Sequence, residues 1–238
     1  LYGKRCLAEL CRRLSGIDGI EWIRLHYLYV DQFDDELIDE IANNPKIVKY
    51  LDIPIQHIND HILKIMNRRG TGEDIRVLFK KLRERIPGLV IRTSLIAGLP
   101  GEGEAEFEEL CEFLKEARIE RVGVFEYSPE EGTEAAEMPD QIDAETKQNR
   151  RLIVEELQSG VLDDYNTSRH GEVMQVLVEG FDDEQQLWYG RTYADSVEVD
   201  GHVYFDAMDT EPAEGEFVNV LITESLGPDL LGVRRKEA

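Results

Sequence analysis

The sequence has few cysteines, few basic residues and no long apolar run. Its 238 residues include three cysteines, and 27 lysines and arginines stand against 50 aspartates and glutamates. No apolar run approaches the roughly 20 residues that a membrane-spanning helix needs, and no secretory signal is visible, so the sequence predicts no membrane segment. Three unpaired-looking cysteines fit a reducing compartment, and we expect the protein in the cytoplasm.

The shortage of basic residues bears on possible partners. The formal net charge is −23 at pH 7. Nucleic-acid binding draws its affinity from Lys and Arg side chains that replace counterions, so the composition disfavours nucleic acid as a direct substrate. An acidic surface instead attracts a basic protein. Adaptation to high salt is an alternative explanation of the acidity, and the two explanations are compatible.

One apolar run breaks into a glycine-rich turn. Residues 90–102 read VIRTSLIAGLPGE, and an amphipathic helical pattern follows them. A buried strand, a turn and a helix in this order form the βα unit of a parallel sheet, in which ligands bind beyond the carboxyl ends of the strands. Gly98 and Gly101 would let a ligand approach the backbone, and Glu102 would place a carboxylate on the rim. A purely structural turn is the alternative interpretation.

Three further segments have the same strand-then-helix or strand-then-turn pattern. Polar side chains gather where these strands end, which predicts part of a (β/α) barrel with a site on its top face. The four predicted strands cover residues 22–30, 50–57, 90–97 and 121–128.

A long helical pattern and a set of short strands follow. The helix is predicted for residues 144–165, with Asp143 as its N-cap. Its predicted apolar stripe consists of Leu152, Ile153, Leu157, Val161 and Leu162. The alternating segments after it predict a small OB-like β-barrel of about five strands. Four of these strands are expected at residues 173–179, 187–192, 202–205 and 217–223.

The predicted fold class is therefore α/β. We expect part of a (β/α) barrel over residues 1–142, a connecting helix over 143–166 and a small all-β barrel over 167–238. The last region has five basic and sixteen acidic residues. Its aromatic residues are interpreted mostly as barrel core, because an RNA-binding groove would combine stacking aromatics with positive charge.

Six segments resemble those of radical S-adenosylmethionine (radical SAM) methylthiotransferases, in the same order and spacing. They are LYV–DQFDDELID, KYLDIPIQH, MNRRGT, IRTSLIAGLPGE, FEYSPEEGT and GRTYADSVEVDG. The last segment is most similar to the RimO-like branch, which modifies an aspartate of a small-subunit ribosomal protein, rather than to the tRNA-modifying MiaB-like branch. The resemblance extends from about Leu1 to Val233. It implies a partial radical-SAM-type barrel followed by a TRAM domain.

The resemblance also implies an activity and a partner. One S-adenosylmethionine would methylate a sulfur on an auxiliary cluster, and another would yield the 5′-deoxyadenosyl radical that takes hydrogen from the aspartate β-carbon. The methylthio group would then join that carbon. The implied partner is a basic small-subunit ribosomal protein. The alternatives are tRNA methylthiolation and a non-catalytic module that only binds the ribosomal protein.

The family binds two [4Fe-4S] clusters through cysteine thiolates, three in a Cys-x3-Cys-x2-Cys motif and three in an N-terminal domain. In this sequence Cys6 and Cys11 lie on a helical pattern, and Cys111 occupies a core position of another helix. We therefore expect no metal ligand in this chain. We interpret it as a C-terminal part of the enzyme that is inactive alone because the cluster cysteines are absent.

The resemblance further implies which residues contact the cofactor, while no catalytic residue is assigned. The strand and turn of residues 90–102 would run along S-adenosylmethionine. Arg92 lies in an otherwise apolar strand, so it should meet either the cofactor carboxylate or an acidic side chain. His57 could equally be a structural histidine, and a role as general base is the less favoured interpretation. The predicted cofactor-binding residues are Gln56, His57, Arg92, Ser94, Ile96, Gly98, Gly101, Glu102 and Tyr127.

Overall fold

The computed structural model describes residues 3–235. The chain divides into two compact units, Leu1–Gln158 and Ser159–Ala238. Helix α7, Ala144–Ser168, begins in the first unit and ends in the second. The domain boundaries expected from the sequence, after residues 142 and 166, therefore remain predictions.

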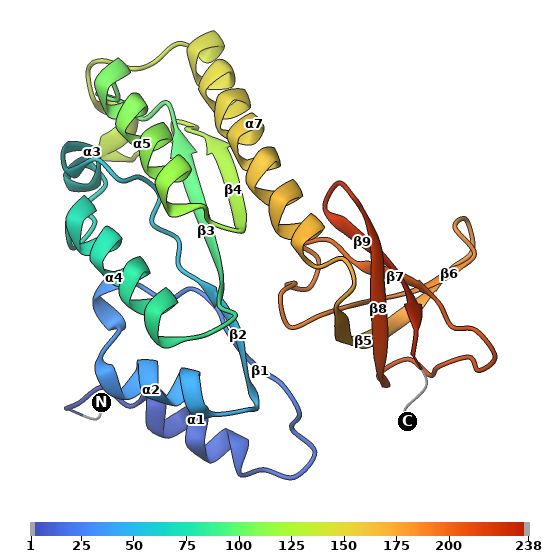
Figure 1. Ribbon diagram of the computed structural model, residues 1–238. Coiled ribbons are helices and arrows are strands. Elements are labelled where there is room, and N and C mark those ends of the chain that lie inside the picture. Colours follow the sequence, from blue (N-terminus) through green and yellow to red (C-terminus); the bar gives the residue numbers. More distant parts are fainter. Residues whose placement is uncertain (1–2, 236–238) are drawn as a thin grey trace. The chain divides into compact units, whose positions relative to one another are not determined.

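The first unit contains a four-stranded parallel sheet in the order β1-β2-β3-β4 (Figure 1). Asp52 pairs with Arg92 across β2 and β3, and Ser94 pairs with Gly123 across β3 and β4. Four parallel strands are present as predicted, but β1 and β2 end at Leu25 and Asp52, earlier than the predicted ends at residues 30 and 57. Their bounds are β1 Ile23–Leu25, β2 Ile47–Asp52, β3 Val90–Ala97 and β4 Arg121–Glu126.

Helices connect these strands and cover one face of the sheet. Along β3, Ile91, Thr93 and Leu95 are buried, whereas Arg92 and the residues that alternate with them are partly exposed. This alternation means that only one sheet face packs into the helical core. The helices are α1 Leu7–Ser15, η1 Val30–Gln32 (a 3₁₀ helix), α2 Asp35–Asn43, α3 Asp60–Ile65, α4 Gly72–Arg85, α5 Glu104–Ala117 and α6 Glu134–Glu137.

Polar side chains fix where several helices begin. Asp34 Oδ1 accepts a hydrogen bond from the Leu37 amide at the start of α2. Thr71 and Asp74 exchange side-chain and backbone hydrogen bonds at the start of α4. Asp143 Oδ1 accepts from the amide of Thr146 at 2.9 Å, so the N-cap predicted for α7 is confirmed. These contacts satisfy amides that a helix leaves unbonded at its first turn.

The buried stripe of α7 differs from the prediction. Leu152 and Ile153 are 47% and 45% exposed, so placing them on an apolar stripe was wrong. The buried positions in the first unit are instead Lys147, Arg150 and Val154. Two cations occupy this face, and the hydrophobic pattern therefore gave no signal for it.

The second unit is a closed barrel in the order β5-β6-β7-β9-β8 (Figure 1). Its core includes Val176, Phe205 and Val220, all fully buried. The predicted small barrel is confirmed. The strands are β5 Val173–Asp182, β6 Leu187–Arg191, β7 Val203–Asp206, β8 Phe217–Leu226 and β9 Asp229–Arg234.

One glycine of this barrel is required by a close approach between strands. A Cβ atom on Gly190 would lie 2.1 Å from the Leu177 carbonyl oxygen of the neighbouring strand. The aromatic residues of the barrel divide between its two faces. Phe205 is in the core, and Trp188 packs partly against it, whereas Tyr189 contacts Tyr204 with 6.0 Å between ring centres.

Within residues 3–235, none of the helices has both the length and the apolar character needed to cross a bilayer.

Candidate functional site

The sheet face that the helices leave uncovered carries polar side chains. Arg92 Nη1 donates hydrogen bonds to Asp52 Oδ1 at 2.8 Å and to Ser94 Oγ at 3.3 Å. Arg92 thus contacts an acidic side chain, which is one of the two partners predicted for it. Ser94 pairs with Gly123, and atoms of the Phe125 ring and of Arg92 lie 3.6 and 3.7 Å from the position that a Cβ atom on Gly123 would take. We call the surface formed by Asp52, Arg92, Ser94 and Ile96 the inner face.

Asp52 of β2 contacts β3 and the turn that follows β1. Its side chain is only 2% exposed, and besides Arg92 it accepts a hydrogen bond from the Tyr27 amide at 3.4 Å. The His26 Nδ1 atom lies 3.7 Å from Asp52 Oδ2. Tyr27 has a φ of 57°, a left-handed conformation that costs free energy for a residue with a side chain. Asp52 therefore helps to hold a strained turn beside the inner face. The sequence-based site did not include Asp52, although a carboxylate inside the apolar strand YLDIPI was a usable signal.

We expect Asp52→Asn to lower the free energy of unfolding by about 1–3 kcal/mol, because hydrogen bonds to charged groups contribute about that much. Chemical denaturation of both variants and of the unaltered chain measures the change. Asp31→Asn is the matched control, since Asp31 and Arg69 form an exposed pair at 3.6 Å. An Asp52→Asn effect no larger than that of the control would contradict a stabilising role for Asp52.

Gln56 joins the inner face through its main chain. Its amide donates to the Ser94 carbonyl at 2.9 Å, and its carbonyl accepts from the Ile96 amide at 3.0 Å. Gln56 has a φ of 70°, a left-handed backbone conformation in the segment that follows β2. Four of the nine predicted residues, Gln56, Arg92, Ser94 and Ile96, therefore lie together along β3.

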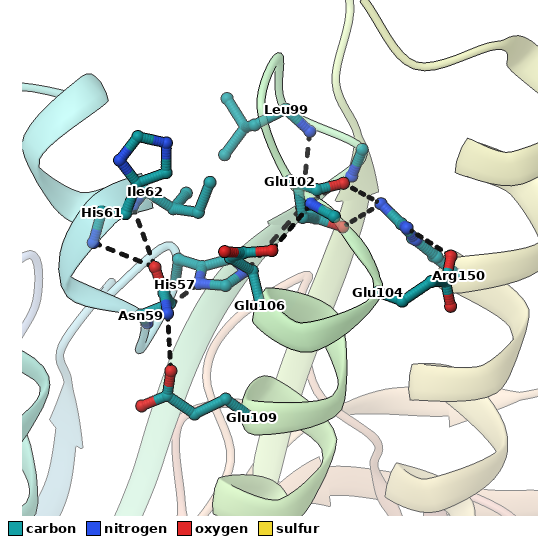
Figure 2. Close-up of polar contacts among 12 residues, drawn as sticks. His57, Asn59, His61, Ile62, Leu99, Glu102, Glu104, Glu106, Glu109 and Arg150 are labelled. Carbon is teal, nitrogen blue, oxygen red and sulfur yellow. Dashed lines mark hydrogen bonds and ion pairs between the residues drawn. The ribbon is translucent and has the colours of Figure 1, made fainter. Parts of the chain in front are cut away.

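The carboxylate of Glu102 holds the glycine turn closed (Figure 2). Its Oε2 atom accepts from the Gly98 amide at 2.9 Å and from the Leu99 amide at 3.4 Å. Its Oε1 atom accepts from Arg150 Nη1 at 3.0 Å, and the same nitrogen bonds the Glu102 carbonyl at 2.6 Å. Glu102 is fully buried, so the expectation of a carboxylate on the rim was wrong. Burial raises the pKa of Glu102, and Arg150 opposes that rise.

His57 lies beside this carboxylate and is also fully buried (Figure 2). Its Nδ1 atom accepts from the Asn59 amide at 3.0 Å, so the neutral ring carries its proton on Nε2. His57 Nε2 has no hydrogen-bond partner among the described residues and lies 3.7 Å from Glu102 Oε2. Burial, and then the charge of Arg150, lower the pKa of His57 from 6.5 to about 4. The ring is therefore neutral near pH 7, which fits a structural histidine.

Asn59 connects His57 to the neighbouring helices (Figure 2). Its Oδ1 atom accepts from the amides of His61 and Ile62 at the start of α3. Its Nδ2 atom donates to Glu109 Oε2 on α5 at 2.6 Å. Asn59 thus links the segment that carries His57 to both α3 and α5.

Both glycines of the turn adopt left-handed backbone conformations. Gly98 has a φ of 79° and Gly101 a φ of 82°. A Cβ atom on Gly98 would lie 2.3 Å from Lys147 Cγ, and one on Gly101 would lie 3.3 Å from Ile65 Cδ1. Side chains would be strained at both positions for conformational reasons, and at Gly98 for steric reasons too.

The remaining predicted residue, Tyr127, follows β4. Its amide donates to the Ala97 carbonyl at 2.9 Å, which places it beside the end of β3. The predicted residues thus form two groups. Gln56, Arg92, Ser94 and Ile96 lie along the inner face, whereas His57, Gly98, Gly101, Glu102 and Tyr127 surround the turn. Sequence reasoning missed Lys147 and Arg150 of α7, since no local pattern connects them to a turn about 50 residues earlier.

The inner face presents both hydrogen-bonding and apolar groups. Ser94 offers a hydroxyl group and Ile96 a partly exposed apolar side chain. No group of three or more His, Cys, Asp or Glu side chains within residues 3–235 is arranged to hold a metal ion. Cys11 is 1% exposed and packs in the core.

Two family models match the chain. Residues 4–114 match the radical SAM superfamily, and residues 171–234 match the TRAM domain. Among solved structures, coproporphyrinogen III oxidase (HemN) from Escherichia coli, a radical SAM enzyme, matches with a TM-score of 0.51 and 18% identity. That match covers 65% of this chain and 36% of the oxidase, and it shows similarity of fold alone.

Curated relatives match almost the whole chain. The ribosomal protein uS12 methylthiotransferase RimO of Acetivibrio thermocellus is 49% identical over 233 residues, which are 98% of this chain and 51% of that protein. The protein of the same name from Clostridium botulinum strain Okra is 46% identical over 98% of this chain and 52% of its own length. The chain spans about half the length of these relatives. Residues 4–114 therefore belong to the radical SAM superfamily, residues 171–234 form a TRAM domain, and the chain as a whole is homologous to the RimO methylthiotransferases.

Proposed function

We propose that this chain is the C-terminal part of a methylthiotransferase that adds a methylthio group to the β-carbon of an aspartate in ribosomal protein uS12. The observation that carries the proposal is 46–49% identity over 98% of the chain to proteins named as uS12 methylthiotransferases. Such identity extends across both the radical SAM region and the TRAM domain.

In this proposal the inner face forms one wall of the S-adenosylmethionine pocket. Ser94 and Ile96 contact the cofactor, and Asp52 orients Arg92 at 2.8 Å. Glu102 and His57 act by shaping the turn, because both side chains are fully buried among protein groups. Gly98 and Gly101 give the turn its conformation.

The radical SAM superfamily implies S-adenosylmethionine and a [4Fe-4S] cluster. When bound, these groups supply the radical and the sulfur chemistry. We propose two clusters, with ligands outside this chain. The residues described here would orient the cofactor and the substrate. That the 238 residues alone are inactive remains a prediction, and an assay of this chain without further protein tests it.

The proposed substrate is a basic protein in the cytoplasm. The region that contains the TRAM domain, residues 167–238, carries five basic and sixteen acidic residues, a charge that favours a basic partner and disfavours tRNA. The acidity also fits a high-salt habitat, so charge supports the target without identifying it.

Mass spectrometry of uS12 and of tRNA after deletion of the gene tests the proposal. We expect the deletion strain to accumulate unmodified uS12 aspartate peptide, while methylthio-adenosine in tRNA stays at its normal level. A complementing gene restores the modified peptide. Loss of methylthio-adenosine with unchanged uS12 would replace the proposal with tRNA modification. Unchanged levels of both would favour a non-catalytic binding module.

A further inference from the structure

Two tyrosines that follow β1 are held at the surface of the first unit. Tyr27 is 73% exposed and Tyr29 is 52% exposed, whereas Leu28 between them is 5% exposed and belongs to the core. The buried leucine fixes this segment to the sheet. Its two neighbours therefore present their rings to solvent from a fixed position.

The backbone at Tyr27 is strained. Its φ of 57° lies in the left-handed region, which is unfavourable for a residue with a bulky side chain. Two contacts with Asp52 hold this conformation. The Asp52 carboxylate accepts a hydrogen bond from the Tyr27 amide at 3.4 Å, and the Asp52 carbonyl accepts one from the Leu28 amide at 2.9 Å. Strained residues that their surroundings hold in place are common at binding sites.

Stability alone does not explain a tyrosine at this position. Glycine adopts the same φ at little cost, and the exposed ring of Tyr27 buries little apolar surface in return for the strain. A contact that the ring makes with another molecule is the remaining physical reason for it.

The ring of Tyr29 shows which kind of group packs on this surface. The guanidinium group of Arg68 lies 5.3 Å from the centre of that ring. Within residues 3–235, no cationic side chain lies over the ring of Tyr27. Because the face of an aromatic ring attracts cations, this ring is able to receive an arginine or lysine side chain from a partner.

We propose that Tyr27 is a docking residue for the protein substrate and that its ring stacks on an arginine or lysine side chain of that substrate. The inference rests on the proposed function, in which the partner is the basic protein uS12. It agrees with the net charge of −23, which attracts a basic partner. Tyrosine and arginine are also among the residues that contribute most to protein interfaces.

Substitution of Tyr27 by glycine separates docking from folding. Since glycine tolerates the left-handed conformation, full-length enzyme with Tyr27→Gly should melt at the same temperature as the unaltered enzyme or at a higher one. We expect its KM for uS12 to rise roughly 3- to 30-fold, the effect of losing a cation–aromatic contact. The kcat and the Kd of S-adenosylmethionine should change by less than about twofold. Tyr27→Phe keeps the ring and should keep the KM within about twofold.

Arg118→Gly is the matched control. Arg118 also has a left-handed backbone, with a φ of 43°, but it lies at the end of α5, before β4 begins. This substitution should leave the KM for uS12 unchanged. A purely structural role of Tyr27 predicts an unchanged KM for both glycine variants, so the KM distinguishes docking from structure.

Replacement of single arginines and lysines of uS12 by glutamine identifies the group that contacts Tyr27. One such replacement should raise the KM of the unaltered enzyme and cause no further rise in Tyr27→Gly, because both changes remove the same contact. The inference is overturned if the unaltered enzyme modifies uS12 but Tyr27→Gly has the same KM as Arg118→Gly, or if every replacement in uS12 adds fully to Tyr27→Gly. An unaltered enzyme that leaves uS12 unmodified would overturn the proposed function itself, and the docking role with it.

Discussion

Glu102→Ala is expected to lower the free energy of unfolding of the first unit by about 3–5 kcal/mol, the usual effect of removing one partner of a buried ion pair. The change removes the acceptor for the Gly98 and Leu99 amides and for Arg150. Arg150 is itself buried, and it would keep the main-chain carbonyl of residue 102, the exposed Glu104 carboxylate and the Phe107 ring as neighbours, without a buried counter-charge. Urea denaturation followed by circular dichroism measures the effect.

Glu104→Ala is the control for that measurement. Its side chain is 82% exposed and bonds the same arginine at 2.8 Å, so we expect a loss of at most about 1 kcal/mol. Equal effects of the two substitutions would show that burial of Glu102 does not determine the strength of the interaction. An effect of Glu102→Ala below about 1 kcal/mol would contradict its role in closing the turn.

The stability of the first unit should fall in acid because of His57. Its pKa is about 4 in the folded protein and 6.5 in an unfolded chain, so the unfolded state binds the proton first. The contribution of neutral His57 is complete above pH 6.5 and is lost as the pH falls toward 4. A difference of this size corresponds to about 3 kcal/mol. Urea denaturation at a series of pH values measures the loss.

His57→Asn isolates this contribution. Asparagine does not titrate, and its side-chain oxygen can accept the Asn59 amide as His57 Nδ1 does. The variant is expected to lose less stability than the unaltered chain between pH 6.5 and 4. Glu102 affects stability with the opposite sign, because its raised pKa makes the free energy of unfolding fall as the pH rises above 4.5. This contribution is present in both proteins, so it does not produce a difference between them. Identical pH profiles of the two proteins would contradict the assignment of a neutral buried histidine.

Much of the fold follows from patterns that are local in the sequence. The apolar run at residues 90–97 is followed by a glycine-rich turn and a helical pattern, and it forms β3 as predicted. The strand β9, Asp229–Arg234, was not located in advance, because its apolar residues form a short run between polar ones. The stripe of α7 was misassigned at Leu152 and Ile153 because Lys147 and Arg150 take buried positions. Hydrophobic periodicity cannot identify a helix face that is buried through ion pairs and aromatic contacts.

The site could be predicted only where its residues share one segment. Arg92, Ser94 and Ile96 alternate along β3, so their common face follows from strand geometry. The partners that give these residues their environment come from elsewhere in the chain. Asp52 reaches Arg92 across the sheet, and Arg150 reaches Glu102 from 48 positions later. Such contacts depend on how elements pack, and a single sequence carries no pattern for them.

Photolabelling of the full-length enzyme with an azido-adenine analogue of S-adenosylmethionine tests most directly whether this chain supplies a wall of the cofactor pocket. Peptide mapping after irradiation locates the label. We predict label within residues 92–98 or 121–128, at the inner face and the carboxyl ends of β3 and β4, and competition by unmodified S-adenosylmethionine. Label confined to the TRAM domain at residues 171–234, or none in this chain, would contradict the account.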